Sequence, residues 1–307
     1  MKYEAVDELD LEEFGTLSDD QRLRHYPLWT AVTAGTNPEF ALQLAQETVD
    51  QWKAVDELAC IQEAHHITPL TMASSVQLPS FLKLLITEGA DINAMDSLGS
   101  VPLTYAIQGE NLDNFRLLIK EGANPDPLED GVGRFSPLAM AAYHGLDIAV
   151  KELLNLRVNV NWVNENGADA TKFAATNGEV VCVELLLNAG ANPASFDTEG
   201  FSAIHNAVDN HHHDVLEELL DAGVDVNLRV ESLTSSVDDG TTPLHRASAG
   251  LDLEMVKILV ERGADINTVS GDSFTPLAYV ISYGDEEDED DAELIQYLID
   301  HGAKSDV

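Results

Sequence analysis

The sequence predicts an all-α solenoid, in which helix-turn-helix units stack on one another and are joined by short β-turn fingers. Three observations predict this fold class: a Pro-Leu motif that recurs every 33 residues, a Gly-Ala-Asp motif in the same register, and an apolar pair between the two. Self-similarity at a period of roughly 20 to 50 residues is typical of repeat architectures. A single unit cannot bury its apolar face alone, so neighbouring units must bury it.

The Pro-Leu motif marks the start of the first helix of each unit. A Ser or Thr before the proline can cap that helix, and proline fits the first helical position because its missing N–H is not needed there. A small residue, such as Ala73 or Ala106, follows three positions after the leucine of the motif and lets neighbouring helices approach. The middle residues of the motifs are 27, 69, 102, 137, 170, 203, 243 and 276.

The Gly-Ala-Asp motif marks the end of the second helix. Glycine at this place ends a helix in the left-handed conformation, and the Asp or Asn that follows favours a turn. An apolar pair before the glycine, such as Leu84-Leu85, gives the second helix a buried stripe. The motif begins at Gly89, Gly122, Gly190, Gly223 and Gly263.

This pattern resembles the ankyrin repeat, most closely at Asp239–Ala247, where Thr242-Pro243-Leu244-His245 stands in the middle. Eight units cover about residues 20 to 307. We interpret residues 1–66 as an N-terminal capping segment with a degenerate unit and an insertion, and residues 67–307 as seven repeats. Two units depart from the pattern: the unit near 164–196 lacks the proline, and Arg157 replaces the helix-ending glycine of the unit before it.

Three insertions interrupt the period. The first lies within residues 47–66. The second, near 229–237, lengthens a finger, and we favour a partner contact there over neutral drift. The third is the acidic run of 285–291, which continues to Glu293 and lacks the ligand alternation and central glycine of a calcium loop. We expect a mobile, solvated loop, with an electrostatic lure for a basic partner as the alternative.

The charge balance restricts the class of partner. The 307 residues hold 55 acidic and 16 basic side chains, a formal net charge of −39. Such a field disfavours nucleic acid and anionic membranes, because both carry negative charge. It favours a protein with a basic surface, whose approach it would steer. The alternative is that the acidity serves solubility alone.

Other features bear on compartment and chemistry. The N-terminus lacks a signal-peptide pattern and no apolar run is long enough to span a membrane, so we expect a cytoplasmic monomer with Cys60 and Cys182 reduced. Three adjacent histidines, 211–213, cannot all face one ion, so no metal or cofactor is expected. His205 and His245 are expected to hydrogen-bond neighbouring turns. No catalytic motif appears, and an enzyme is disfavoured.

The ankyrin resemblance implies binding through the concave side, which the turn tips and the exposed ends of the first helices line. Aromatic anchors within a polar, acidic rim are typical of protein interfaces. The alternative is that these rings pack against neighbouring turns. The candidate partner-binding residues are Phe135, Tyr143, His144, Glu165, Asn177, Glu199, Phe201, Asp209, Asn210, Asp238, Asp239, Phe274 and Tyr283.

These observations predict a protein-binding module. The favoured function is an acidic inhibitor or immunity-type protein that binds and occludes a basic partner protein through its concave face. The alternative is an effector or regulatory adaptor without an inhibitory role. Function rests here on analogy between folds, which does not fix it.

Overall fold

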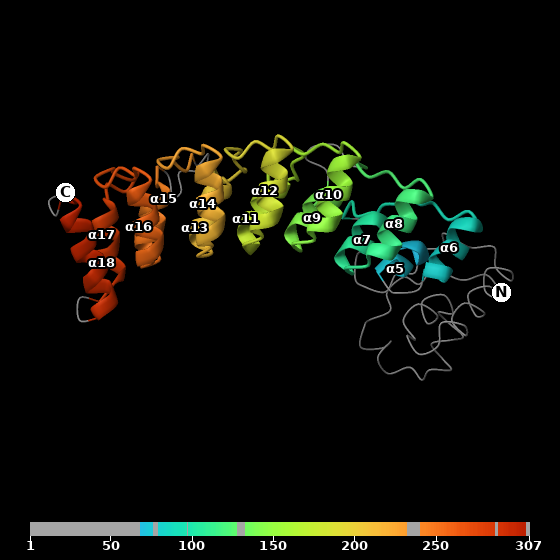
Figure 1. Cartoon of the computed structure of the whole chain (residues 1–307), viewed down its shortest axis with the longest axis horizontal. Coiled ribbons are helices and arrows are strands. Elements are labelled where there is room, and N and C mark those ends of the chain that lie inside the picture. Colours follow the sequence, from blue (N-terminus) through green and yellow to red (C-terminus); the bar gives the residue numbers. More distant parts are fainter. Residues whose placement is uncertain are drawn as a thin grey trace. The chain divides into compact units, whose positions relative to one another are not determined.

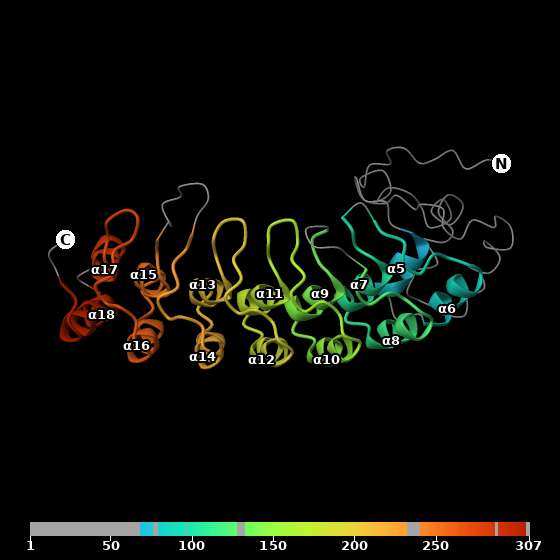
Figure 2. The same cartoon turned by 90° about the horizontal axis from the view of Figure 1, so that it is seen from above.

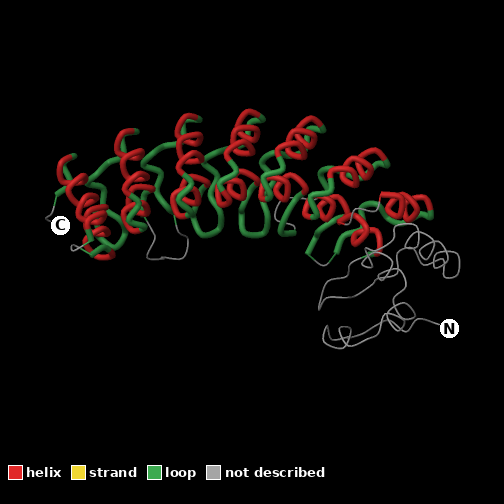
Figure 3. Tube along the Cα trace, turned by 60° about the horizontal axis from the view of Figure 1, so that its bottom comes forward, coloured by secondary structure: helices red, strands yellow, loops and turns green. Residues whose placement is uncertain are grey.

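The predicted all-α fold class is confirmed. The computed structural model describes residues 68–75, 79–96, 98–127, 133–231, 240–285 and 288–304. Within these ranges the chain forms fourteen α-helices and no strand, and the helices are joined by turns and loops (Figure 3). The first helix of each pair has seven or eight residues, and the second usually has nine.

The chain divides into two compact units. The first consists of residues 1–141 and 155–158, and the second of residues 142–154 and 159–307. The helices α9 and α10 cross the boundary between these ranges. In the first unit, Asn114 on the second helix of its pair donates two hydrogen bonds to the carbonyls of Ala73 and Ser74, at 3.2 and 3.1 Å. The helices up to this boundary are α5 (Pro69–Ser75), α6 (Pro79–Thr87), α7 (Pro102–Gln108), α8 (Leu112–Lys120), α9 (Pro137–Tyr143) and α10 (Asp147–Asn155).

In the second unit, consecutive helix pairs follow one another in register. The pairs succeed one another along the chain (Figure 1), and the first helices α11, α13, α15 and α17 form one row, which lies between the finger turns and the row of second helices (Figure 2). These helices are α11 (Ala170–Asn177), α12 (Val180–Asn188), α13 (Ala203–Asp209), α14 (His213–Asp221), α15 (Pro243–Ala249), α16 (Leu253–Glu261), α17 (Pro276–Tyr283) and α18 (Glu289–Asp300).

The helix boundaries follow the predicted signals. The side chain of Asp169 accepts a hydrogen bond from the Lys172 amide, and Thr275 does the same for Ala278, so both cap a helix. Gly190 and Gly263 take left-handed φ values of 92° and 90° after the second helices. Arg157, which replaces such a glycine, also has a positive φ of 63°. The conformation is therefore kept where the residue type is not.

The core is the seam between helices of neighbouring pairs. One member of each predicted apolar pair is fully buried, such as Leu118, Leu219 and Leu259, while the other is half-buried. The small residue of the first helix, such as Ala174 or Ala207, has no exposed surface. Burying one leucine side chain contributes roughly 1.5–3 kcal/mol, so stacking of pairs stabilises each of them.

The finger turns are linked by polar side chains. Asn161 accepts a hydrogen bond from the Asn192 amide at 2.8 Å, and Asn227 accepts one from the Asp265 amide at 2.7 Å. The predicted role of the two buried histidines is confirmed. Nε2 of His205 donates to the carbonyl of Leu228, and Nε2 of His245 donates to that of Phe274, each at 3.1 Å.

Lys172 stands at the histidine position of the α11 unit. Its side chain is buried, its ammonium donates to the carbonyl of Phe201 at 2.8 Å, and it pairs with Asp197. Burial lowers the pKa of Lys172, while the Asp197 carboxylate opposes that shift. A buried ion pair therefore makes the link between units that a histidine makes elsewhere.

The prediction of a loop for the whole acidic run is wrong for Glu289–Glu293. These residues form the first turns of α18, and the carboxylate of Asp288 caps the helix by accepting from the Asp290 amide at 2.9 Å. Acidic side chains in the first turn are stabilised by the positive end of the helix dipole. The charges therefore start a helix instead of preventing one.

Some predictions fall on residues outside the described ranges. These are the capping segment 1–66 with its insertion, the finger residues 232–239, and residues 286–287 of the acidic run. The division into a capping segment and seven repeats stays a prediction. Among the described helices, none combines the length and apolar character that crossing a membrane requires.

Candidate functional site

The second unit gathers the predicted residues into three clusters along the row of first helices. The first cluster joins Phe201, Asp209 and Arg246. The Nε and Nη2 atoms of Arg246 donate to the two carboxylate oxygens of Asp209 at 2.5 and 2.6 Å. The guanidinium carbon lies 4.7 Å from the centroid of the Phe201 ring. Arg246 therefore bridges α13 and α15 and holds both predicted residues in place.

The second cluster lies on α17 and the finger before it. Tyr279 and Tyr283 stack with ring centroids 5.9 Å apart and planes 22° from parallel. Phe274 lies 5.7 Å from Tyr279, and His245 packs edge-on against the same ring at 5.6 Å. Phe274 and Tyr283 are exposed, at 43% and 65%. This cluster presents the most accessible aromatic surface among the predicted residues.

The third cluster surrounds Tyr143. Its ring meets those of His144 and Phe173 edge-on, at 5.2 and 6.2 Å. The side-chain amide of Asn177 donates to the Tyr143 carbonyl at 2.9 Å. Tyr143 is 39% exposed, so part of its ring faces solvent. The predicted residues Tyr143, His144 and Asn177 therefore lie together.

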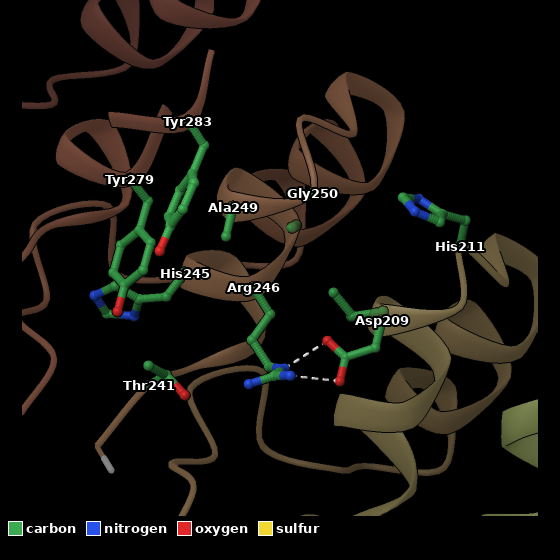
Figure 4. Close-up of a pocket in the computed structure, with 11 residues that line it drawn as sticks. Asp209, His211, Thr241, His245, Arg246, Ala249, Gly250, Tyr279 and Tyr283 are labelled. Atoms are coloured by element: carbon green, nitrogen blue, oxygen red, sulfur yellow. Dashed lines mark hydrogen bonds and ion pairs between the residues drawn. The ribbon is translucent and has the colours of Figure 1, made fainter. Parts of the chain in front are cut away.

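A pocket of about 410 Å³ opens between the first and second clusters (Figure 4). Figure 4 shows Tyr279 and Tyr283 on one side, Asp209 and His211 on the other, and Arg246 between them. Ala249 and Gly250 of the α15 unit form part of its lining.

Hydrogen bonding fixes the protonation of His245, a fully buried residue that lines the pocket. The Thr242 amide donates to Nδ1 of His245 at 3.1 Å, so this ring is neutral with its proton on Nε2. Burial lowers the pKa of His245 to about 4. The ring is therefore a neutral part of the wall at physiological pH.

His211 connects the pocket to a carboxylate behind it. Its Nδ1 lies 2.7 Å from Asp252, and Nε2 of His213 lies 3.0 Å from the same carboxylate oxygen. Burial acts to raise the pKa of Asp252, but bonds from the Met255 amide and both histidines lower it on balance. His212 instead bonds the Thr176 carbonyl at 3.0 Å. Within the described residues, no group of His, Cys, Asp and Glu has the arrangement of a metal site.

The remaining predicted residues lie outside these clusters. Glu165 and Glu199 are exposed on finger turns, and Asn210 is exposed and bonds the Asn206 carbonyl at 2.8 Å. Phe135 belongs to the first unit, and both Phe135 and Phe201 are half-buried. Asp238 and Asp239 lie outside the described residues.

Sequence reasoning missed Phe173, Arg246 and Tyr279. Each lies four residues after the capping residue of its first helix, and each organises one of the three clusters. The signal was available, because residues four apart on a helix share a face. Tyr279 follows that rule with Tyr283.

Comparison with known proteins decides the family. Models described as ankyrin repeats match residues 28–128, 138–230, 204–260 and 252–299, which together cover most of the chain. The chain belongs to the ankyrin-repeat family. Ankyrin repeats are protein–protein interaction modules, and the family is generally a non-enzymatic scaffold.

Curated ankyrin-repeat relatives are much longer than this chain. It is 33% identical over 256 residues to ankyrin repeat and KH domain-containing protein mask-1 of Caenorhabditis elegans, covering 80% of this chain and 9% of that protein. It is 29% identical over 180 residues to human transient receptor potential cation channel subfamily A member 1, covering 58% of this chain and 16% of that protein. It is 29% identical over 187 residues to tyrosine-protein kinase HTK16 of Hydra vulgaris, covering 56% of this chain and 24% of that protein.

Proposed function

We propose that this ankyrin-repeat chain binds a protein with a basic surface and occludes it, as an acidic inhibitor or immunity-type protein would. The observation that carries the proposal is the row of three aromatic clusters on the first helices of a chain with net charge −39. A few residues carry most of the binding energy at protein interfaces, and Tyr, Trp and Arg are enriched among them. Complementary charge accelerates association.

The position of the clusters supports a face rather than a single point of contact. Tyr143, Arg246 and Tyr283 come from α9, α15 and α17, so one partner surface would engage several units. Occlusion follows if that surface contains the partner's active site. A regulatory adaptor is the second candidate, because the chain matches only 9% to 24% of the relatives above, which are named as a KH domain-containing protein, a cation channel and a tyrosine-protein kinase.

The experiment captures partners from a lysate on the immobilised chain and on two variants. We expect a basic protein to bind, to be released as salt rises, and to bind at least tenfold more weakly to Tyr143→Ala or Tyr283→Ala. Val181→Ala is the matched control, because Val181 is an exposed apolar residue on the second helix α12. The activity of the captured protein is then titrated with the purified chain.

Three results separate the proposals. Loss of the partner's activity at saturation supports inhibition. Binding without a change in activity favours the adaptor. Capture that is insensitive to salt and to both tyrosine variants would overturn binding of a basic protein through this face.

A further inference from the structure

The pocket between α13, α15 and α17 exists because α15 carries two very small residues at one place. Its residues seven and eight positions after the cap are Ala249 and Gly250. The equivalent places hold Asp209 and Asn210 on α13, and Ser282 and Tyr283 on α17. The row of side chains is therefore interrupted at α15, and the resulting hollow is large enough for one long side chain of a partner.

The walls of the hollow combine ring faces with a carboxylate. The stacked pair of Tyr279 and Tyr283 bounds one side, and Tyr283 is 65% exposed. Asp209 bounds the other side. A cation over a tyrosine face is attracted by the ring quadrupole, and a guanidinium also stacks on such a face because it is weakly hydrated.

The molecule already shows how this face holds a guanidinium. Arg246 lies on the Phe201 ring at 4.7 Å and donates to both oxygens of Asp209. One unit further on, Thr241 and Ala249 stand where Phe201 and Asp209 stand, so no equivalent ring and carboxylate fill the space. The hollow is bounded instead by Tyr283 from the following unit and by the same Asp209.

Charge decides between a cation and an anion as the occupant. The charge of Arg246 is balanced by the two hydrogen bonds it makes to Asp209, and His245 is neutral. The carboxylate of Asp252 lies directly behind His211. An anion would therefore meet the carboxylates of Asp209 and Asp252 and the field of a chain with net charge −39.

We propose that this pocket receives an arginine side chain of the partner, with the aliphatic stem over Ala249 and Gly250 and the guanidinium between the Tyr283 ring and Asp209. This inference rests on the proposed binding of a basic protein and names the group that anchors it. Two guanidinium groups, one from Arg246 and one from the partner, then share the Asp209 carboxylate.

The test uses the full chain alone, with small probes of defined chemistry. The alanine methyl groups are labelled with ¹³C, and the signal of Ala249 is followed by NMR while N-acetyl-arginine methylamide is added. We expect a saturable shift. The same amide of norleucine, which has the stem without the charge, is expected to bind at least fivefold more weakly, and that of glutamate is expected to give no shift.

Three variants make the result specific. Tyr283→Ala is expected to weaken the arginine probe at least fivefold, whereas Tyr283→Phe keeps the ring and retains binding. Ala249→Leu fills the hollow and is expected to abolish binding, followed through the tyrosine ring signals. Ala222→Leu is its control, because Ala222 is an exposed residue at the end of the second helix α14.

Failure of this inference is distinct from failure of the proposed function. If the norleucine or glutamate probe binds as well as arginine, or if Ala249→Leu changes nothing, the arginine pocket is overturned even when a basic partner is captured. If arginine binds as expected and no basic protein is captured, the proposed function fails and the pocket stands.

Discussion

The α11 and α15 units each donate a side-chain hydrogen bond to the following finger turn, but one donor is charged and the other is neutral. Lys172 donates to the carbonyl of Phe201, and His245 donates to the carbonyl of Phe274, each of these being the residue before the next helix cap. In α11 the donor is an ammonium paired with Asp197, and in α15 it is a neutral ring. The comparison teaches that the geometry of a repeat is kept while its electrostatics change.

The largest expected effect comes from removing the charged donor. Lys172→Ala removes a buried ammonium and leaves the half-buried Asp197 without its partner, and breaking a buried pair costs about 3–5 kcal/mol. The free energy of unfolding, measured by urea denaturation, is expected to fall by that amount. Lys151→Ala is the control, because its pair with Asp147 is exposed and contributes less than about 1 kcal/mol. Equal losses in the two variants would contradict the comparison.

Acid is expected to weaken the histidine links and to spare the lysine link. Burial lowers the pKa of His205 and of His245 from 6.5 to about 4, so each ring stays neutral in the folded chain while the unfolded chain takes up a proton. Their contribution is complete above pH 6.5 and is lost as the pH falls to about 4. The loss is on the order of 3 kcal/mol for each histidine.

The α11 link responds differently to acid. Its donor, Lys172, is already an ammonium paired with Asp197, so acidification adds no proton to it. Burial raises the pKa of the Asp169 carboxyl, which caps α11. On acidification the folded chain therefore binds a proton at Asp169 before the unfolded chain does, and the free energy of unfolding gains a contribution from this residue. Hydrogen exchange at pH 7 and pH 4.5, corrected for intrinsic rates, is expected to show protection falling in α13 and α15 relative to α11. A uniform loss across the three helices would refute this difference.

The smallest expected effect concerns Arg157, which takes a left-handed conformation where other units have glycine. Arg157 holds a φ of 63° where Gly190 holds 92° one unit later. A residue with a side chain in this conformation is strained by about 1–2 kcal/mol, but glycine has more unfolded-state entropy to lose. Arg157→Gly is therefore expected to raise the free energy of unfolding, measured by urea denaturation, by up to about 1 kcal/mol. A decrease would show that the arginine side chain makes compensating contacts.

The sequence predicts the repeated parts well because their signals are local. Caps such as Thr275, the left-handed Gly263 and the histidine bonds of His245 depend on residues within one unit and its neighbour. The site is harder to predict because its contacts join units. Arg246 meets Asp209 across 37 positions, and nothing near either residue indicates the partner. The loop predicted for the acidic run is wrong at Glu289–Glu293 because the prediction considers repulsion between the carboxylates and omits the helix cap that Asp288 provides for α18.

The two hydrogen bonds from Arg246 to Asp209 have a consequence for the kinetics of partner binding. A long side chain that is immobilised at an interface loses about 0.5–1.5 kcal/mol of conformational entropy. Arg246 has lost that freedom already on folding, since two hydrogen bonds and the Phe201 ring fix its rotamer. A partner that docks there meets an arginine that is already ordered. We therefore expect differences in affinity among such partners to appear mainly in their dissociation rates.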